Sequence, residues 1–199
     1  MGSVTVLTAL AARLNREAGR PPIPALFFFT DPARTPDPVA CALRLPRGAA
    51  VVYRHFGASD RARTARRLSL ICRARGLLLL IAADPDLAQR TGAGVHWPER
   101  LLSSMPSRQT EGLVTAAAHS SAAVADASRF GVSACVLGPV FATRSASANA
   151  PLGLFRASQI ARAAGTPVIA LGGIDAKTAR RLVGRGFAGI AAVGALARG

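Results

Sequence analysis

Eight short apolar runs, spread along the whole chain, limit most strongly how this sequence can fold. Each run is continuously apolar instead of alternating with polar residues, which is typical of a strand that is buried on both faces. Strands of that kind occur in parallel sheets that are covered by helices. The sequence therefore predicts eight parallel strands, at Ala25–Thr30, Ala49–Arg54, Leu77–Ala82, Gly94–Trp97, Leu113–Ala117, Ala134–Leu137, Pro167–Leu171 and Gly189–Val193.

The segments between these runs have the pattern of surface helices. Ser59–Arg75 places apolar residues at helical spacing with arginines on the opposite face, and Ser120–Phe130 and Asp175–Arg185 are similar. Asp175 can cap the third of these helices. A glycine that can stop the helix follows each segment, at Gly76, Gly131 and Gly186.

Eight strands that alternate with helices can close into a barrel or lie open as a doubly wound sheet. The count favours a single parallel (β/α)8 TIM barrel over residues 1–199, with an N-terminal helical extension. No GxGxxG follows the first strand, so the open dinucleotide-binding alternative lacks its fingerprint. We expect the proline-rich stretches 21–24 and 31–38 to be loops within this one domain.

The charge of the chain is strongly positive, with 25 Lys and Arg against 10 Asp and Glu and a net charge of +15. Lys177 is the only lysine, and the arginines are scattered without a basic run or interleaved aromatic residues. This scatter indicates a solvated basic surface and no nucleic-acid partner. An attraction for small anions is the expectation that remains.

Cysteine usage and the N-terminus indicate a cytoplasmic protein. The three cysteines are far apart and lack metal-ligand spacing, so we expect buried free thiols and no metal site. The apolar stretch before Arg13 has about nine residues, too few to span a bilayer. It also lacks the basic segment that opens a signal peptide. We therefore expect no membrane partner, while a homo-oligomer stays open.

Three loops in the last third of the chain indicate an anion site. LGPVFATRSAS follows the sixth strand, LGGID the seventh and VGALARG the eighth. In a parallel barrel these ends share the catalytic face, where loops after strands seven and eight commonly present N–H groups to phosphate. Gly172 and Gly173 allow close approach, and Thr143, Ser145 and Ser147 add hydroxyl donors. The glycines alone could serve tight turns, but three such loops on one face favour phosphate binding.

These motifs together resemble the thiamine phosphate synthases and the related thiazole tautomerases. The resemblance rests on FFFTD, GVHW, GPVFATRS, APLGL, PVIALGGI and GIAAVGAL, which extend over nearly the whole chain after Ala25. It implies a barrel that, in the synthases, joins an aminopyrimidine pyrophosphate to a thiazole phosphate and releases pyrophosphate. The tautomerases isomerise a thiazole carboxylate phosphate. The implied partner is thus a phosphorylated thiazole or thiamine phosphate.

The resemblance carries some site residues over to this chain. Arg54 is implied as a contact of the pyrophosphate, and we assign Thr143 and Ser145 to the same group of substrate contacts. The implied phosphate cradle uses backbone groups, so the glycine that replaces the family's serine at position 194 changes little. This cradle consists of Gly153, Gly172, Gly173, Val193 and Gly194.

The pyrophosphate and magnesium apparatus of the family is eroded. Of the family's Q-x-R-x-K motif at strand two, this chain retains only Arg54. The family's N-D pair after strand three aligns with Ala82 and Ala83, and Asp84 lies one place later. The acidic residue expected in the loop after GVHW falls near Arg100, beside Glu99, and the lysine and serine expected elsewhere are Ala146 and Ala117. Arg144 could replace the lost cation. Magnesium is therefore expected only if synthase activity is retained.

His119 ends the fifth strand at the catalytic face and matches the acid–base histidine of the tautomerases. Moving a proton around a thiazole needs a group that titrates near neutrality, as histidine does. His119 could instead only shape the turn, and we interpret His96, His55 and Trp97 as structural, loop and packing residues. Three hypotheses remain: a synthase with compensating residues, a tautomerase that uses His119, and a non-catalytic binding protein.

Overall fold

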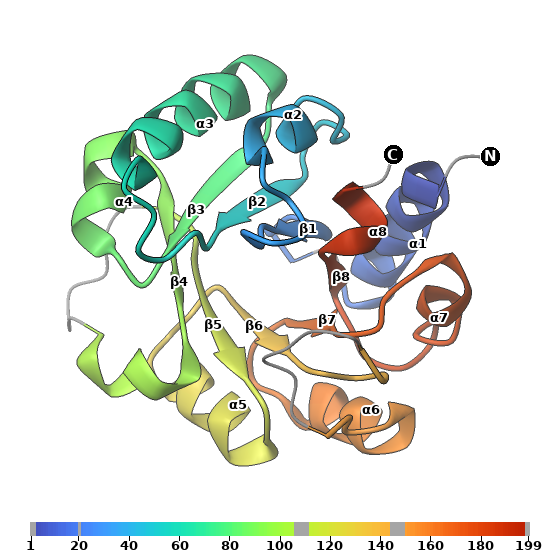
Figure 1. Cartoon of the computed structure of the whole chain (residues 1–199). Coiled ribbons are helices and arrows are strands. Elements are labelled where there is room, and N and C mark those ends of the chain that lie inside the picture. The colour runs from blue at the N-terminus through green and yellow to red at the C-terminus, as the bar shows by residue number, and fades with distance from the viewer. Residues whose placement is uncertain (1–2, 20, 106–111, 144–149, 198–199) are drawn as a thin grey trace.

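The computed structural model describes residues 3–19, 21–105, 112–143 and 150–197. Within these residues, parallel strands form a closed barrel in which each strand pairs with the next along the chain and the last pairs with the first (Figure 1). The predicted (β/α)8 barrel is confirmed. Its strands are β1 (Leu26–Phe29), β2 (Ala50–Tyr53), β3 (Leu78–Ala82), β4 (Gly94–Trp97), β5 (Val114–Ala118), β6 (Ala134–Leu137), β7 (Val168–Leu171) and β8 (Gly189–Ala192).

Helices surround the barrel (Figure 1). The first of them precedes β1 and packs against β1, β8 and the last two helices, so it is the expected N-terminal extension. None of the described helices has the length and apolar character needed to cross a membrane. The helices are α1 (Ser3–Glu17), α2 (Pro38–Ala42), α3 (Arg61–Arg75), α4 (Pro85–Thr91), the 3-10 helix η1 (Glu99–Ser104), α5 (Ser121–Arg129), α6 (Leu154–Ala163), α7 (Ala176–Arg180) and α8 (Gly194–Ala197).

Two elements differ from the sequence prediction. The proline-rich stretch 31–38 is not only a loop, because Pro38 opens α2 and the Asp37 carboxylate caps that helix by accepting from Ala40 N–H. Proline is compatible with a first helical turn, where its missing N–H costs nothing. Helix α7 ends at Arg180 instead of Arg185, and the chain continues in tighter turns in which Leu182 N–H donates to Ala179.

The cap predicted for α7 is present. The Asp175 carboxylate accepts from the N–H groups of Lys177 and Thr178 at 2.8 Å each, and Thr178 Oγ1 accepts from Asp175 N–H at 2.9 Å. These hydrogen bonds lower the pKa of Asp175, the bond from Thr178 N–H being the largest cause. This reciprocal capping box fixes where the chain after β7 turns away from the barrel.

Alternation along each strand divides the apolar side chains into an inner and an outer cluster. The inner cluster includes Phe29, Val52, Ile169 and Ala191, while the outer cluster packs under the helices. All three cysteines are buried free thiols, as predicted. Because side chains alternate with a period of two, the residue two places after the last inward side chain of a strand is aimed at the C-terminal mouth of the barrel. Those positions hold Asp31, Arg54, Asp84, Pro98, His119, Gly138, Gly173 and Val193.

Candidate functional site

Arg54 is held firmly at the mouth of the barrel, directly after β2. Its backbone N–H donates to Thr30 Oγ1 and its Nε–H donates to the Thr30 carbonyl, both at 2.9 Å. Its guanidinium carbon lies 5.2 Å from the centre of the Phe29 ring. Burial is the largest effect on the pKa of Arg54 and lowers it, although the side chain keeps 25% of its surface exposed. Arg54 therefore presents a preorganised cation to the mouth.

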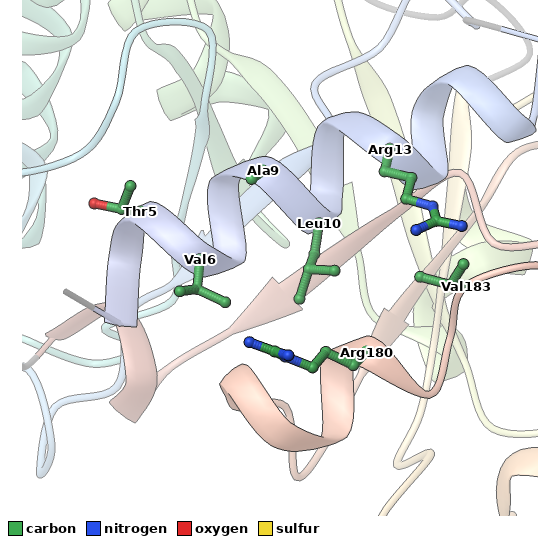
Figure 2. A pocket seen from close by; sticks show the side chains of 7 residues that line it. All are labelled: Thr5, Val6, Ala9, Leu10, Arg13, Arg180 and Val183. Carbon is green, nitrogen blue, oxygen red and sulfur yellow. The ribbon is translucent and has the colours of Figure 1, made fainter. Parts of the chain in front are cut away.

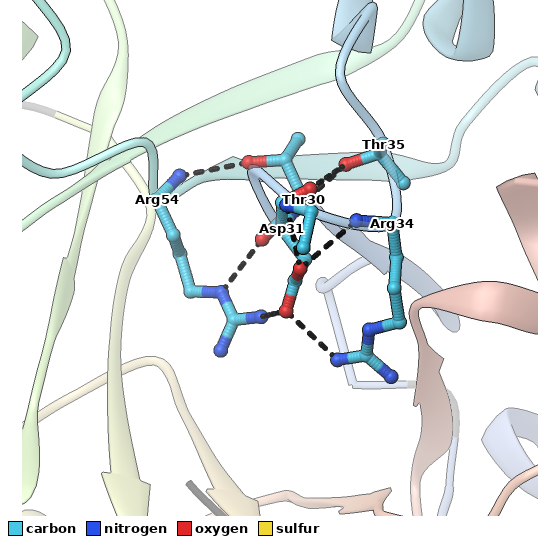
Figure 3. A network of polar contacts seen from close by, with 6 residues as sticks. Thr30, Asp31, Arg34, Thr35 and Arg54 are labelled. Carbon is cyan, nitrogen blue, oxygen red and sulfur yellow. Dashed lines mark hydrogen bonds and ion pairs between the residues drawn. The ribbon is translucent and has the colours of Figure 1, made fainter. Parts of the chain in front are cut away.

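Asp31 connects Arg54 to the loop after β1. Figure 3 shows the Asp31 carboxylate between the guanidinium groups of Arg34 and Arg54. Its Oδ2 lies 2.9 Å from Arg34 Nη2 and 3.9 Å from Arg54 Nη2, and its Oδ1 accepts from the N–H groups of Ala33 and Arg34. The hydrogen bond from the Arg34 side chain is the largest cause that lowers the pKa of Asp31. The sequence analysis missed this residue, although FFFTD contains it.

His96 lies beneath this network, inside the barrel. Its Nδ1 is 2.9 Å from Thr115 Oγ1, and its ring meets Phe29 edge-on with the ring centres 5.1 Å apart. Burial, with a smaller effect from Arg54, lowers the pKa of His96 to about 3. The interpretation of His96 as structural fits this environment. Trp97 is buried in the outer cluster under the helices, so it does not line the mouth.

The glycine pair after β7 lets the loop after β6 pass very close to it. A Cβ on Gly172 would lie 2.5 Å from Pro139 Cα, and a Cβ on Gly173 would lie 2.5 Å from the Ala142 carbonyl oxygen. Both glycines also have positive φ, at 97° and 63°. Close packing and the backbone conformation therefore explain why glycine is required at both positions. The loop is joined to β7 by hydrogen bonds from Val140 N–H to Leu171 and from Phe141 N–H to Gly172.

Helix α6 begins at the same edge of the mouth. Leu152 N–H and Gly153 N–H donate to the carbonyls of Pro139 and Val140, which fixes the start of α6 beside the loop after β6. The Gly153 N–H is therefore already bonded. Gly153 is the N-cap, and no side chain of the described residues caps the helix. The first N–H groups of this ten-residue helix, beginning at Leu154, point out of its positive end and need an outside acceptor.

Val193 and Gly194 complete this side of the mouth. Leu171 pairs with Ala191, and the same register continued by two places sets Gly173 beside Val193. The Val193 carbonyl accepts from Leu196 N–H and opens α8. The structure thus brings Gly153, Gly172, Gly173, Val193 and Gly194 to neighbouring strand ends, and their role in binding phosphate stays a prediction.

His119 lies directly after β5 and is exposed at the mouth. Its Nδ1 is hydrogen-bonded to the Gly138 carbonyl, and its backbone N–H donates to Glu99 Oε2 at 2.8 Å. A carbonyl can only accept, so Nδ1 carries the proton and a neutral His119 has Nε2 as an acceptor. The ring is therefore set up to take a proton at Nε2.

The hydroxyl groups assigned to the substrate contacts are only partly described. Thr143 is half-buried at the end of the loop that follows β6. Ser145 and Ser147, together with Arg144 and Ala146, lie outside the described residues. Their assignment stays a prediction.

His55 lies in the loop after β2, as expected, but its side chain is buried. His55 is 7% exposed, and its ring centre lies 5.1 Å from that of Tyr53. The Arg61 guanidinium lies over the same Tyr53 ring at 5.3 Å. Burial is the largest cause that lowers the pKa of His55. Alternation would have placed His55 on the outer face with Tyr53, because the two are two positions apart along the chain.

The described acidic residues do not fit a magnesium ion. Within the described ranges, no three His, Cys, Asp or Glu side chains gather closely enough to hold a metal. Asp84, the acid nearest the place where the resemblance expects one, accepts from Leu87 N–H at 2.9 Å as the cap of α4. Magnesium requires several oxygen ligands around one point. We therefore derive no step through a metal.

A pocket of about 490 Å³ lies on the outside of the barrel between α1 and α7 (Figure 2). Apolar side chains form its wall, and Arg13 and Arg180 stand at its edge. None of its lining residues belongs to the mouth described above. Chemistry at the strand ends is therefore separate from this pocket.

Comparison with solved structures supports the barrel. The thiamine phosphate pyrophosphorylase from Pyrococcus furiosus superposes with a TM-score of 0.70 at 24% sequence identity, covering 84% of each chain. The citrate synthase SbnG superposes with a TM-score of 0.58 at 14% identity, covering 92% of this chain and 90% of that one. At these identities the likeness shows the fold alone.

Sequence comparison is more specific. Thiamine-phosphate synthase of Chlorobium luteolum is 36% identical over 187 residues, which cover 89% of this chain and 87% of that protein. The enzyme of the same name from Marinobacter nauticus is 32% identical over 183 residues, covering 87% and 82%. Residues 27–196 match the model of the family described as thiamine monophosphate synthase. This chain therefore belongs to the thiamine monophosphate synthase family.

Proposed function

We propose that this chain is a transferase that joins an aminopyrimidine pyrophosphate to a thiazole phosphate, forming thiamine phosphate and releasing pyrophosphate. The observation that carries the proposal is the uncapped start of α6 beside the Gly172–Gly173 pair, at the mouth of a barrel of this family. A helix N-terminus with unpaired N–H groups is suited to a monophosphate. The thiazole phosphate is therefore assigned to the ends of β6, β7 and β8.

The second anion is assigned to the opposite side of the mouth. In a closed ring with the order β1 to β8, β2 lies across from β6. Arg54 follows β2, so its guanidinium lies across the mouth from the start of α6. Two substrates, each held by its phosphate end, would meet with their rings between these positions. Orienting two reactants in this way removes much of the entropic barrier of a bimolecular step.

Arg54 would then act on the leaving group. As the bond between the pyrimidine methylene and pyrophosphate breaks, negative charge grows on the pyrophosphate oxygens. A fixed guanidinium stabilises such charge more strongly than water does, because it needs no reorganisation. The hydrogen bonds of Arg54 to Thr30 and its contact with Phe29 supply that fixation.

The test is turnover by the purified chain given both substrates. We expect thiamine phosphate and pyrophosphate to appear in equal amounts, and Arg54→Gln to lower kcat/KM by about 100-fold. Arg66→Gln, which removes an exposed charge from α3, should leave kcat/KM unchanged. Absence of thiamine phosphate under every condition that supports a known synthase would refute the proposed reaction.

A second candidate function is the isomerisation of a thiazole carboxylate phosphate, favoured by the orientation of His119. Its Nδ1 bond to Gly138 leaves Nε2 to take a proton from the substrate and return it elsewhere. Under this hypothesis His119→Gln abolishes isomerisation and retains phosphate binding. Isomerisation without joining would support this candidate, and binding of thiazole phosphate without either reaction would support a non-catalytic role.

A further inference from the structure

The carboxylates at the mouth are all committed to other partners. Asp31, Asp84, Glu99 and Asp175, which follow four of the strands, each accept hydrogen bonds from their own loop or from a neighbour, while Asp86 is exposed on α4. Glu99 accepts from His119 N–H, and Asp31 accepts from three donors of Ala33 and Arg34. Asp175 accepts from Lys177 N–H and Thr178 N–H. Among the described residues, no three such side chains gather closely enough to hold a metal ion.

The end of β3 shows this commitment most clearly. Ala83 has a left-handed backbone with φ of 56°, and this turn leads directly into the cap that Asp84 makes on α4. Arg61 closes the same edge, since its Nη2 donates to the Ala82 carbonyl at 2.8 Å and its Nε lies 3.7 Å from Asp84 Oδ2. The Arg61 guanidinium therefore lies at the end of β3, where the resemblance expects an acidic metal ligand.

Arg61 also has one N–H donor group that is unpaired among the described residues. This group, at Nη1, is buried, and the side chain is 14% exposed. Buried donors without partners are rare in folded proteins. The guanidinium carbon lies 5.3 Å from the centres of the Tyr53 and Phe56 rings. Together with Arg54, this side of the barrel carries two partly buried guanidinium groups, and the carboxylates of Asp31 and Asp84 are already hydrogen-bonded.

From this arrangement we propose that the β1–β3 side of the mouth binds a pyrophosphate group through arginine side chains and without a divalent metal. The inference rests on the proposed function for the identity of the anion. Guanidinium groups supply charge and directional N–H donors that match phosphate oxygens, which covers the two needs that magnesium otherwise meets. Arg54 is the central contact, and Asp84 serves as the cap of α4 and is not one of the contacts.

Inorganic pyrophosphate is the probe that tests this inference. Its dissociation constant for the whole chain, measured by calorimetry, should agree within about threefold between EDTA and millimolar magnesium, after correction for the magnesium–pyrophosphate complex. Arg54→Gln should weaken binding by about tenfold or more in both solutions, because a charge-assisted contact is lost. Arg66→Gln should weaken it less than twofold. Binding that requires magnesium would overturn the inference.

Asp84→Asn gives an independent control, because asparagine also caps helices and the fold is retained. We expect unchanged pyrophosphate affinity and unchanged turnover, with and without magnesium. If Asp84 were a metal ligand, the substitution would lower affinity only in magnesium, and the inference would be wrong. Normal α-helical circular dichroism of the variant confirms that the cap is intact.

The inference and the proposed function fail in different ways. Turnover that depends on magnesium would support the synthase function and refute the metal-free site. Metal-independent binding of pyrophosphate without turnover would support the metal-free site and refute the proposed reaction. Turnover in EDTA that is lost in Arg54→Gln supports both.

Discussion

His96 is a histidine that the fold keeps uncharged. Burial inside the barrel, with a smaller effect from Arg54, lowers its pKa to about 3, against an ordinary value of 6.5. The folded chain therefore binds fewer protons than the unfolded chain at mildly acid pH. The contribution of neutral His96 to the free energy of unfolding should be fully present above pH 6.5. It should be lost as the pH drops from 6.5 towards 3.

This sign gives a measurable loss of stability. Between pH 7 and pH 5 we expect His96 to reduce the free energy of unfolding by about 2 kcal/mol, measured by urea titration. His96→Gln, which cannot titrate, should remove that part of the pH dependence. Burial lowers the pKa of His55 as well, so a smaller slope of the same sign should persist in the variant. An identical pH dependence in both proteins would show that His96 is not the cause.

At the residue scale, the sequence predicted where the site residues lie along the strands better than it predicted their hydrogen-bond partners. Arg54 and His119 were placed at strand ends from local pattern and resemblance, and the structure places them there. The bond from Arg54 to Thr30 and the bond from His119 to Gly138 join different strands, so no local pattern could reveal them. The burial of His55 also escaped prediction, although His55 lies two positions from Tyr53 and its ring packs beside that of Tyr53.

At the scale of elements, the closeness of the loop after β6 to the end of β7 makes Gly172 a sensitive position. Gly172→Ala adds a Cβ at 2.5 Å from two Pro139 atoms and places alanine at φ of 97°. We expect the free energy of unfolding to fall by about 3 kcal/mol, the sum of backbone strain and overpacking. Chemical denaturation measures this loss.

Gly184→Ala is the matched control, because Gly184 also has positive φ, at 69°, but has nothing within 4 Å of its added Cβ. It should cost only the backbone strain, about 1 kcal/mol. Equal losses in the two variants would contradict the packing explanation and leave conformation alone as the role of Gly172.

The strands were predictable because burial on both faces leaves a continuous apolar signal. Each predicted run contains its observed strand or differs from it by one residue at an end, as in β5. The short helices α2 and α7 were harder to predict. Five residues carry too little periodicity, and their limits are set by the Asp37 and Asp175 caps and by turns that tighten into i→i−3 bonds.

At the scale of the whole molecule, the proposed function places two anion sites across one mouth. It assigns the monophosphate to the start of α6 and the ends of β7 and β8, and the pyrophosphate to Arg54 with the Asp31 network. The net charge of +15 adds a long-range attraction for both anionic substrates. The position of each phosphate is thus the central claim about how this family member works.

A crystal structure of the chain with thiamine phosphate tests that claim most directly. The account predicts that the phosphate accepts hydrogen bonds from the first N–H groups of α6, at Leu154 and Phe155, and lies against the Gly172–Gly173 turn. The pyrimidine ring should then extend across the mouth towards Arg54. A phosphate bound at Arg54 instead, or in the pocket between α1 and α7, would contradict the account.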